Sequence, residues 1–364
     1  MRVAVTLEQC WHRVPGGSAR ATLDTIDAVA ALGGVEQVGV SARHGAPPAT
    51  DWRPSIPVRA LPLPRLALYD SWQRLRRPRV ERATGPVDVV HATAHVASAS
   101  RAPWVATVHD LHFLHEPSHF TKRGVSVFTR FLDLVRSEAA LVLCPSEATL
   151  ADCVAAGIDA ARLRLTPWGI ASDRATEADL DRVRAAYGLE RPFVLFAGTV
   201  EPRKNLPRLL EAFARLRSTD AELVLVGPDG WGDAPPALGD RVRRLGFVPN
   251  ADRDALFGAA AVVAYPSLRE GFGLPVLEAM AQGAVVVTSS TTSTAEVAGD
   301  AALLVDPLDV DAIAGALERA ITDVDLASRL RSAAEARAAT FTWARTAEAV
   351  SAAYREAAGE RVLR

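Results

Sequence analysis

The amino-acid sequence predicts an α/β protein built from two Rossmann-like, doubly wound domains. At 364 residues the chain is longer than one hydrophobic core usually serves, which favours two domains. Short apolar, β-rich runs alternate with alanine-rich helical stretches along the whole chain, as in parallel sheets made of βαβ units. Both halves show this alternation, and a ligand that two such domains share is expected in a central cleft facing the carboxyl ends of their strands.

Six runs in each half have the length and composition of strands. In the first half they span residues 2–8, 35–42, 87–94, 104–110, 140–146 and 162–168. In the second half they span residues 192–199, 221–228, 242–248, 261–267, 284–290 and 302–307. The proline-rich segment 54–66 is expected to be an extended segment or a surface loop.

The domain boundary is predicted between these two sets of strands. Residues 169–191 lack strand character, carry many charges and end before Pro192, which is typical of a linker. We therefore expect an N-terminal domain over 1–168 and a C-terminal domain over 192–342. Residues 343–364 have apolar side chains at helical spacing and predict a terminal amphipathic helix.

The composition excludes several classes of protein. A net charge of -2 excludes a generally basic nucleic-acid-binding protein. No apolar run approaches the roughly 18–20 residues of a membrane-spanning helix, and the N-terminal apolar segment is too short for a signal peptide. Because Cys10, Cys144 and Cys153 have no metal-binding or CxxC spacing, they predict buried thiols in a reducing, cytoplasmic compartment.

Positive charge is densest between Arg74 and Arg82. A solvated surface helix explains this run about as well as a surface for an anionic acceptor or for peripheral contact with the inner face of a membrane. Both interpretations stay open at this point.

The stretch "LREGFGLPVLEAMAQG", residues 268–283, follows a predicted strand. Pro275 suits the start of a helix and Gly283 its left-handed end, so a helix is expected over 275–282. This places Glu270 in the loop and Glu278 in the first helical turn. A helix N-terminus preceded by glycines predicts a phosphate site, although Glu278 could instead only complement the helix dipole.

The stretch "EPRKN", residues 201–205, follows another predicted strand. It contains one of only two lysines in the chain, Lys204, beside Arg203. An ammonium next to a planar guanidinium suits a diphosphate. A solvated turn is the alternative interpretation.

Two features stand out in the N-terminal half. "RVPGGSAR" follows the first strand, so Gly16 and Gly17 predict a flexible turn before a helix with Ser18 as its N-cap. Several histidines cluster between residues 91 and 119, but their spacing does not match known metal motifs, and we expect no metal site. His109 ends a predicted strand and is expected to point to the cleft, whereas His112 and His115 are expected in a loop or in packing.

The second half resembles the retaining GT-B glycosyltransferases of family 4. The resemblance covers residues 193–307 strongly, through "FAGTVEPRKNLPRLLEAF", "GFVPNADRDALFGAAAVVAYPSLREGFGLPVLEAMAQG" and "AEVAGDAALLVDP", and the rest of the chain more loosely. One departure is "AQGAVVV", where the family commonly has a cysteine and a threonine-proline. The resemblance implies a GT-B fold and transfer of a hexose from a nucleotide-diphosphate sugar to an acceptor hydroxyl, with retained anomeric configuration and without a metal. It also implies that the terminal helix crosses back to the N-terminal domain.

The resemblance also implies roles for residues of the C-terminal half. Arg203 and Lys204 would bind the diphosphate and stabilise the departing phosphate, Glu278 would bind the ribose, and Glu270 would contact hydroxyls of the sugar. The backbone would line the ligand at Gly271, Phe272 and Gly273, at the helix start from Leu274 to Val276, and at Val248 beside the nucleobase.

In the N-terminal half, the resemblance implies that Gly16 and Gly17 close over the donor phosphates. His109 would donate to the sugar or stabilise developing charge, and Asp110 would orient a neighbour. The region "VHDLHFLHEP" is similar to bacterial mannosyltransferases, which favours GDP-mannose over UDP-sugars as the co-substrate. No other cofactor is implied, and the acceptor could be a saccharide, a lipid-linked sugar or a small molecule.

Two alternatives to a transferase follow from the same residues. One is a sugar-nucleotide epimerase or hydrolase on the same architecture, and the other is a non-catalytic module that binds sugar nucleotides. A nicotinamide dehydrogenase is disfavoured because the glycine fingerprint GxGxxG is absent.

Overall fold

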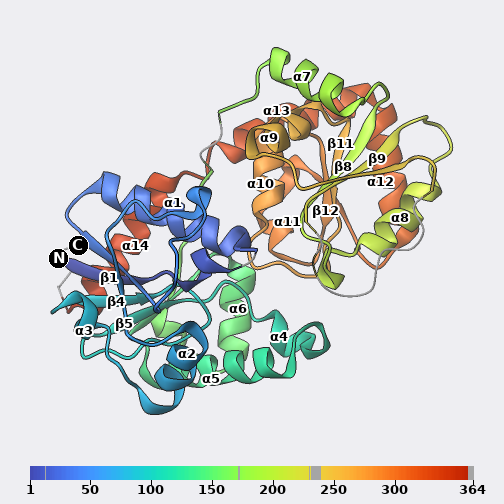
Figure 1. The fold of residues 1–364 in the computed structure, drawn as a ribbon. Helices are drawn as coiled ribbons and strands as arrows, with labels where there is room; N and C mark the ends of the chain where they lie inside the picture. Colours follow the sequence, from blue (N-terminus) through green and yellow to red (C-terminus); the bar gives the residue numbers. More distant parts are fainter. Residues whose placement is uncertain (13, 171–172, 229, 231–238, 360–364) are drawn as a thin grey trace. The chain divides into compact units, whose positions relative to one another are not determined.

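The computed structural model describes residues 1–12, 14–170, 173–228, 230 and 239–359. It divides into two compact units, residues 1–169 with 342–364 and residues 170–341, which are described separately below (Figure 1). Across the described residues, we find no helix that combines the length and the apolar character needed to cross a membrane.

Unit 1 contains a sheet of seven parallel strands in the order β3-β2-β1-β4-β5-β6-β7. The strands are β1 Arg2–Thr6, β2 Glu36–Ser41, β3 Val58–Ala60, β4 Val89–Ala92, β5 Trp104–Thr107, β6 Leu141–Cys144 and β7 Leu163–Leu165. Their central members are rich in buried valine, alanine and leucine, as expected of parallel strands covered on both faces.

Helices cover both faces of this sheet. On one face α1 packs beside α14, and their side chains share a core with Val3, Val5 and Val89. On the other face α2, α5 and α6 enclose a second core that includes Trp72 and Phe131. The helices of unit 1 are α1 Gly16–Leu32, α2 Arg65–Leu75, α3 Glu81–Thr84, α4 His112–His115, α5 Lys122–Glu138, α6 Glu147–Ala155 and α14 Trp343–Ala357.

Unit 2 contains six parallel strands in the order β10-β9-β8-β11-β12-β13. The strands are β8 Phe193–Ala197, β9 Glu222–Val226, β10 Val242–Gly246, β11 Val262–Tyr265, β12 Val286–Ser289 and β13 Leu303–Val305. Its helices are α7 Glu177–Tyr187, α8 Leu206–Ala214, α9 Asn250–Ala259, α10 Leu274–Ala281, α11 Ser293–Ala298, α12 Val310–Thr322 and α13 Val324–Ala338. Helices α8 and α12 pack together on one face, while α9 and α10 contact the strands from the other.

Short 3-10 helices complete both units. They lie at Glu8–Trp11, Thr50–Trp52, Pro117–His119, Ala160–Arg162, Pro202–Lys204 and Gly299–Ala301.

These features confirm the prediction of two doubly wound α/β domains. The C-terminal helix also returns to the N-terminal unit as predicted, since α14 packs on α1. The start of this helix packs directly against Gly169, and only glycine fits there, because a Cβ atom on residue 169 would lie 2.2 Å from the backbone nitrogen of Trp343.

Three local expectations differ from the structure. Segment 54–66 is extended at Val58–Ala60, which forms edge strand β3 and agrees with the prediction, but helix α2 begins inside the segment at Arg65. The predicted linker 169–191 contains helix α7 of unit 2, which starts at a capping box between Thr176 and Asp179. The expected Arg74–Arg82 surface helix ends at Leu75, because Arg76 is left-handed, and α3 starts only at Glu81.

The strand order reverses next to β1 in unit 1 and next to β8 in unit 2. At such a switch point the loops after two adjacent strands run to opposite sides, which opens a crevice at the carboxyl ends of the strands. In unit 2 the two adjacent strands are β8 and β11, and the loops that follow them carry both predicted motifs.

Candidate functional site

The loops that follow β8 and β11 are tied together in unit 2. The backbone nitrogen of Leu268 donates to the carbonyl oxygen of Arg203 at 2.8 Å. The side-chain amide of Asn205 donates to the carbonyl oxygens of Pro266 at 2.9 Å and Pro307 at 2.6 Å. Asn205 therefore fixes three strand ends relative to one another from a buried position.

The two predicted cations and Glu270 meet in one cluster. Arg203 donates to Glu270 at 2.6 Å and to Glu201 at 2.8 Å. Lys204 donates to the other oxygen of Glu270 at 2.7 Å and also to the hydroxyl of Tyr265. The side chains of Lys204 and Glu270 are each only 7% exposed, which rules out the alternative of a solvated turn.

The electrostatics of this cluster keep Glu270 ionised. Burial alone would raise its pKa, but the charges of Arg203 and then Lys204 outweigh burial and hold the pKa of Glu270 at about 2. Burial, followed by the charge of Arg203, lowers the pKa of Lys204, while Glu270 opposes that shift. A carboxylate with such a low pKa does not act as a general acid near neutral pH.

Helix α10 starts next to this cluster with no side-chain cap. Its first residue is Leu274, one position earlier than predicted, with Pro275 second and Gly273 as N-cap at φ 108°. A Cβ atom on Gly273 would lie 2.9 Å from Cγ2 of Thr294, so only glycine fits without strain. Pro275 has no N–H and the N–H of Val276 donates to the carbonyl oxygen of Gly273 at 3.0 Å, so the helix start offers an anion the N–H of Leu274 together with the positive end of the helix dipole.

Glu278 lies in the second turn of α10 rather than in the first turn as predicted. The helix dipole acts mainly on the first turn, so complementing the dipole does not explain this residue. Its carboxylate pairs instead with Arg253 of α9 at 3.0 Å. Glu270 and Glu278 therefore belong to separate ion pairs.

The backbone of the glycine loop is supported from behind. The side chain of Phe272 is buried against Phe341, with ring centroids 6.0 Å apart. The hydroxyl of Ser293 donates to the carbonyl oxygen of Glu270 at 2.8 Å. Gly271 lies between these two anchored residues, and Val248 is buried in the loop between β10 and α9.

In unit 1, Gly16 and Gly17 form the first turn of α1. The predicted cap Ser18 lies inside the helix, whose N-cap is Pro15 and carries no side-chain cap bond. Gly16 has φ 70°, a left-handed value that favours glycine. The start of α1 is therefore uncapped, as in α10.

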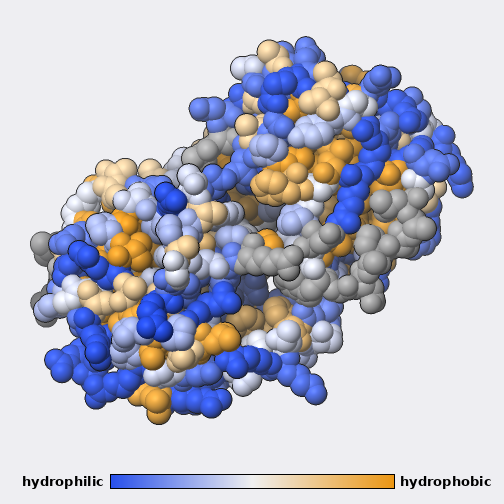
Figure 2. All heavy atoms as spheres, viewed as in Figure 1, coloured by the Kyte–Doolittle hydropathy of each residue, from blue (hydrophilic) through white to orange (hydrophobic). Residues whose placement is uncertain are grey.

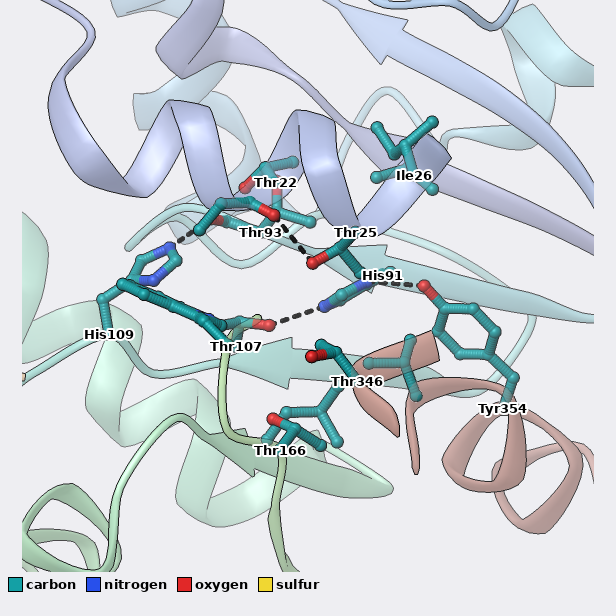
Figure 3. A pocket seen from close by; sticks show the side chains of 15 residues that line it. Thr22, Thr25, Ile26, His91, Thr93, Thr107, His109, Thr166, Thr346 and Tyr354 are labelled. Atoms are coloured by element: carbon teal, nitrogen blue, oxygen red, sulfur yellow. Dashed lines mark hydrogen bonds between the residues drawn. The ribbon is translucent and has the colours of Figure 1, made fainter. Parts of the chain in front are cut away.

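His109 lies beyond the end of β5 and lines a small cavity of about 20 Å³ in unit 1 (Figure 3). Its Nε2 donates to the carbonyl oxygen of Thr93 at 2.8 Å, whereas Nδ1 is buried without a partner. Burial, and then the nearby His95, lower the pKa of His109 to about 4. At neutral pH Nδ1 is therefore an acceptor, and the expectation that His109 donates to the sugar or stabilises developing charge stays a prediction.

His91 lines the same cavity from β4 (Figure 3). Its ring nitrogens contact the hydroxyls of Tyr354 in α14 and Thr107 in β5, each at 2.7 Å. Burial, and then His109, lower its pKa to about 3. The neutral ring thus joins the sheet to the C-terminal helix.

Acidification should weaken unit 1 through His91. The unfolded chain binds a proton at His91 below about pH 6.5, whereas the folded chain does so only near pH 3, so stability falls between these values by up to about 1.4 kcal/mol per pH unit. In urea unfolding at pH 7.5, 6 and 5, His91→Gln should lose less stability on acidification than the parent. Equal losses in both proteins would contradict the prediction.

The remaining histidines do not assemble a metal site. Nε2 of His112 lies 3.0 Å from Nδ1 of His119, and His115 contacts Asp152 at 3.2 Å. Asp110 accepts from the backbone nitrogen of His112, which agrees with an orienting role. The described parts of the chain hold no group of three or more His, Cys, Asp or Glu arranged for a metal ion, and independence of metal stays a prediction.

Sequence reasoning missed three residues that shape the site: Asn205, Tyr265 and Arg253. Asparagine directly before a helix in a strand-to-helix loop is a usable signal, since it tolerates left-handed backbone. Tyr265 and Arg253 carry no such signal, because a strand tyrosine and a helix arginine are ordinary.

Known families and proteins match both halves of the chain. A family model described as "Glycosyl transferases group 1" matches residues 179–337, and one described as "Glycosyltransferase Family 4" matches residues 15–174. The chain is 34% identical to O-antigen chain mannosyltransferase B of Escherichia coli over 66% of each protein. It is 32% identical to D-inositol 3-phosphate glycosyltransferase of Stackebrandtia nassauensis, over 79% of this chain and 72% of that relative.

Solved structures match the fold across the chain. HepE of Anabaena, crystallised with UDP and glucose, superposes with a TM-score of 0.75 at 19% identity, over 97% of this chain and 98% of HepE. WaaG, a glycosyltransferase involved in lipopolysaccharide biosynthesis, superposes with a TM-score of 0.72 at 20% identity, over 96% of this chain and 98% of WaaG. Together with the two parallel sheets, these matches confirm the GT-B fold.

Proposed function

Since this chain belongs to glycosyltransferase family 4, the group 1 glycosyl transferases, we propose that it moves a hexose from a nucleoside-diphosphate sugar to an acceptor hydroxyl. The observation that carries this proposal is the pair of buried Lys204 and half-buried Arg203 beside the uncapped start of α10. A buried ammonium, a guanidinium and the positive end of a helix dipole together suit a diphosphate.

The proposed reaction places negative charge on the departing diphosphate. Arg203, Lys204 and the α10 N-terminus are already in place to stabilise that charge, which is the most effective form of electrostatic catalysis. A cationic site of this kind supplies what a divalent metal supplies in other transferases, so we propose transfer that does not depend on a metal.

We propose that the anomeric configuration is retained without a covalent intermediate. A nucleophilic carboxylate must approach the anomeric carbon, but both oxygens of Glu270 already accept from Arg203 and Lys204. This arrangement supports attack from the face of the departing phosphate, with Glu270 holding sugar hydroxyls and balancing positive charge on the ring.

For the donor we propose GDP-mannose. The support is the likeness to the mannosyltransferase of Escherichia coli, whereas HepE, which binds UDP and glucose, shares only the fold. We expect GDP to raise the Tm more than UDP in thermal unfolding with both nucleotides. Proton NMR of the product formed from GDP-mannose would then show its anomeric configuration. If no nucleotide sugar supports transfer to any of a panel of saccharide acceptors, the proposal is contradicted.

Glu278 is proposed to bind the ribose. Glu278→Ala removes hydrogen bonds to a charged group, so nucleotide Kd measured by calorimetry should rise about 10- to 100-fold. The matched control is Glu211→Ala, which removes an exposed glutamate of α8 in the same unit and should leave Kd unchanged. Equal Kd values for all three proteins would contradict the role.

We propose that the acceptor is a saccharide linked to a lipid. Unit 1 would then contact the inner face of the membrane that carries this lipid. Arg77, Arg79, Arg82 and Arg101 line one solvent-open hollow beside the end of α2, and the visible surface around α2 mixes hydrophilic with apolar side chains (Figure 2). Arg79→Glu with Arg82→Glu should abolish sedimentation with vesicles of anionic lipid at low salt. Unchanged sedimentation would remove this surface from the proposal.

A further inference from the structure

Tyr265, the last residue of β11, contacts Lys204 of the candidate site. It is fully buried, and its hydroxyl accepts a hydrogen bond from Nζ of Lys204. Nζ also lies 4.7 Å from the centroid of the tyrosine ring. The ammonium is therefore held at the hydroxyl end of the tyrosine side chain.

The two acceptors of Lys204 fix the direction in which its ammonium group points. An ammonium has three N–H donors, and here one is given to Tyr265 and one to Glu270. One N–H is left for a ligand. A lysine side chain has several freely rotating bonds, so without these two acceptors the ammonium would not keep one direction.

We infer that Tyr265 is a positioning residue that aims the third N–H of Lys204 at the departing phosphate of the donor. This inference rests on the proposed function and adds to it a residue that touches neither donor nor acceptor. Phe196 of β8 supports the tyrosine from behind, since the two rings stack with centroids 6.2 Å apart and an interplanar angle of 21°. Of the two acceptors that aim the ammonium, Tyr265 is thus fixed by two adjacent strands of the sheet, whereas Glu270 lies in the loop after β11.

Tyr265→Phe is the variant that isolates this role, because it keeps the ring and deletes only the hydroxyl. A buried ammonium that loses one acceptor holds its proton less well, so the pKa of Lys204 should fall further below its ordinary value. The aim of the N–H should also loosen, which affects the transition state more than ground-state binding. We expect kcat to fall about 10- to 100-fold with the donor KM changed little.

The lysine content of the chain makes a direct readout possible. Only Lys122 and Lys204 are present, so protein labelled with 13C at lysine Cε shows two side-chain NMR signals. Lys122 is exposed at the start of α5 and serves as an internal control. In Tyr265→Phe, the titration of the Lys204 signal should move lower by about one pH unit or more while that of Lys122 stays.

The matched control is Tyr187→Phe, which deletes a tyrosine hydroxyl that donates to Asp252 elsewhere in unit 2. It should leave both lysine signals and kcat as in the parent. If Tyr265→Phe shows the parent's Lys204 titration or the parent's kcat, Tyr265 does not position the ammonium. If the Lys204 signal responds to Tyr265→Phe but no nucleoside diphosphate moves that signal in the parent, the positioning holds and the proposed function fails.

Discussion

Lys204→Met is expected to lower kcat/KM for sugar transfer by about 10²- to 10³-fold, the usual loss when one preorganised donor to a developing charge is removed. Methionine keeps much of the volume of the aliphatic stem but carries no charge. Glu270 would keep Arg203 as its partner at 2.6 Å, so the carboxylate would not be stranded in the protein interior. The loss should therefore be mainly catalytic.

Steady-state transfer rates with circular dichroism as a test of folding would check this expectation. Lys122→Met is the matched control, because it removes the other lysine of the chain from an exposed position. Parent-like kcat/KM in a folded Lys204→Met protein would show that the ammonium has no part in the reaction. Lys204→Arg should not restore the rate, since a planar guanidinium does not fit the contacts with Tyr265 and Glu270.

Much of the fold follows from local sequence pattern. All twelve predicted strand runs contain observed strands, because buried parallel strands read as short apolar runs bounded by glycine, proline and polar residues. Strand β3 escaped prediction because Val58–Ala60 lies between prolines and is largely solvent-accessible at a sheet edge. Edge strands tolerate such sequences, so their composition does not separate them from loops.

The candidate site was predictable only as far as strand ends could be located. The sequence placed Arg203 and Glu270 each after a predicted strand, and the structure shows that these strands, β8 and β11, are neighbours in the sheet and that the two side chains pair. The meeting itself depends on strand order, which local sequence does not carry. Likewise, Arg253 lies 20 residues or more from Glu278 along the chain, and only the packing of α9 on α10 brings the two together.

The protonation of His109 is a second property that could not be predicted from the sequence. Its position after a strand indicated a site residue, but its protonation depends on burial and on His95, which the sequence does not reveal. The hydrogen bond to Thr93 then decides which nitrogen carries the proton. In the fold, Nε2 of His109 is the donor and Nδ1 the acceptor.

Asn205→Ala is expected to lower the free energy of unfolding of unit 2 by about 3 kcal/mol. The substitution leaves the carbonyl oxygens of Pro266 and Pro307 without their buried donor, at roughly 1–3 kcal/mol for unsatisfied groups. It also places a Cβ-bearing residue with no local hydrogen bond at φ 62°, which costs about 1–2 kcal/mol in the left-handed region. Both effects act at the loop that carries Arg203 and Lys204, so nucleotide binding should weaken as well.

Asn205→Gly separates the two contributions, because glycine accepts the left-handed backbone but makes no amide hydrogen bonds. Urea unfolding followed by fluorescence should rank the parent above Asn205→Gly and Asn205→Gly above Asn205→Ala. The difference between parent and glycine reports the two bonds that join the ends of β8, β11 and β13 together with the bond that Arg208 donates to Oδ1 of Asn205 at 2.9 Å. The difference between glycine and alanine reports mainly the backbone. If alanine is as stable as the parent, the amide does not join these strand ends, and the placement of Lys204 must be explained by Tyr265 and Glu270 alone.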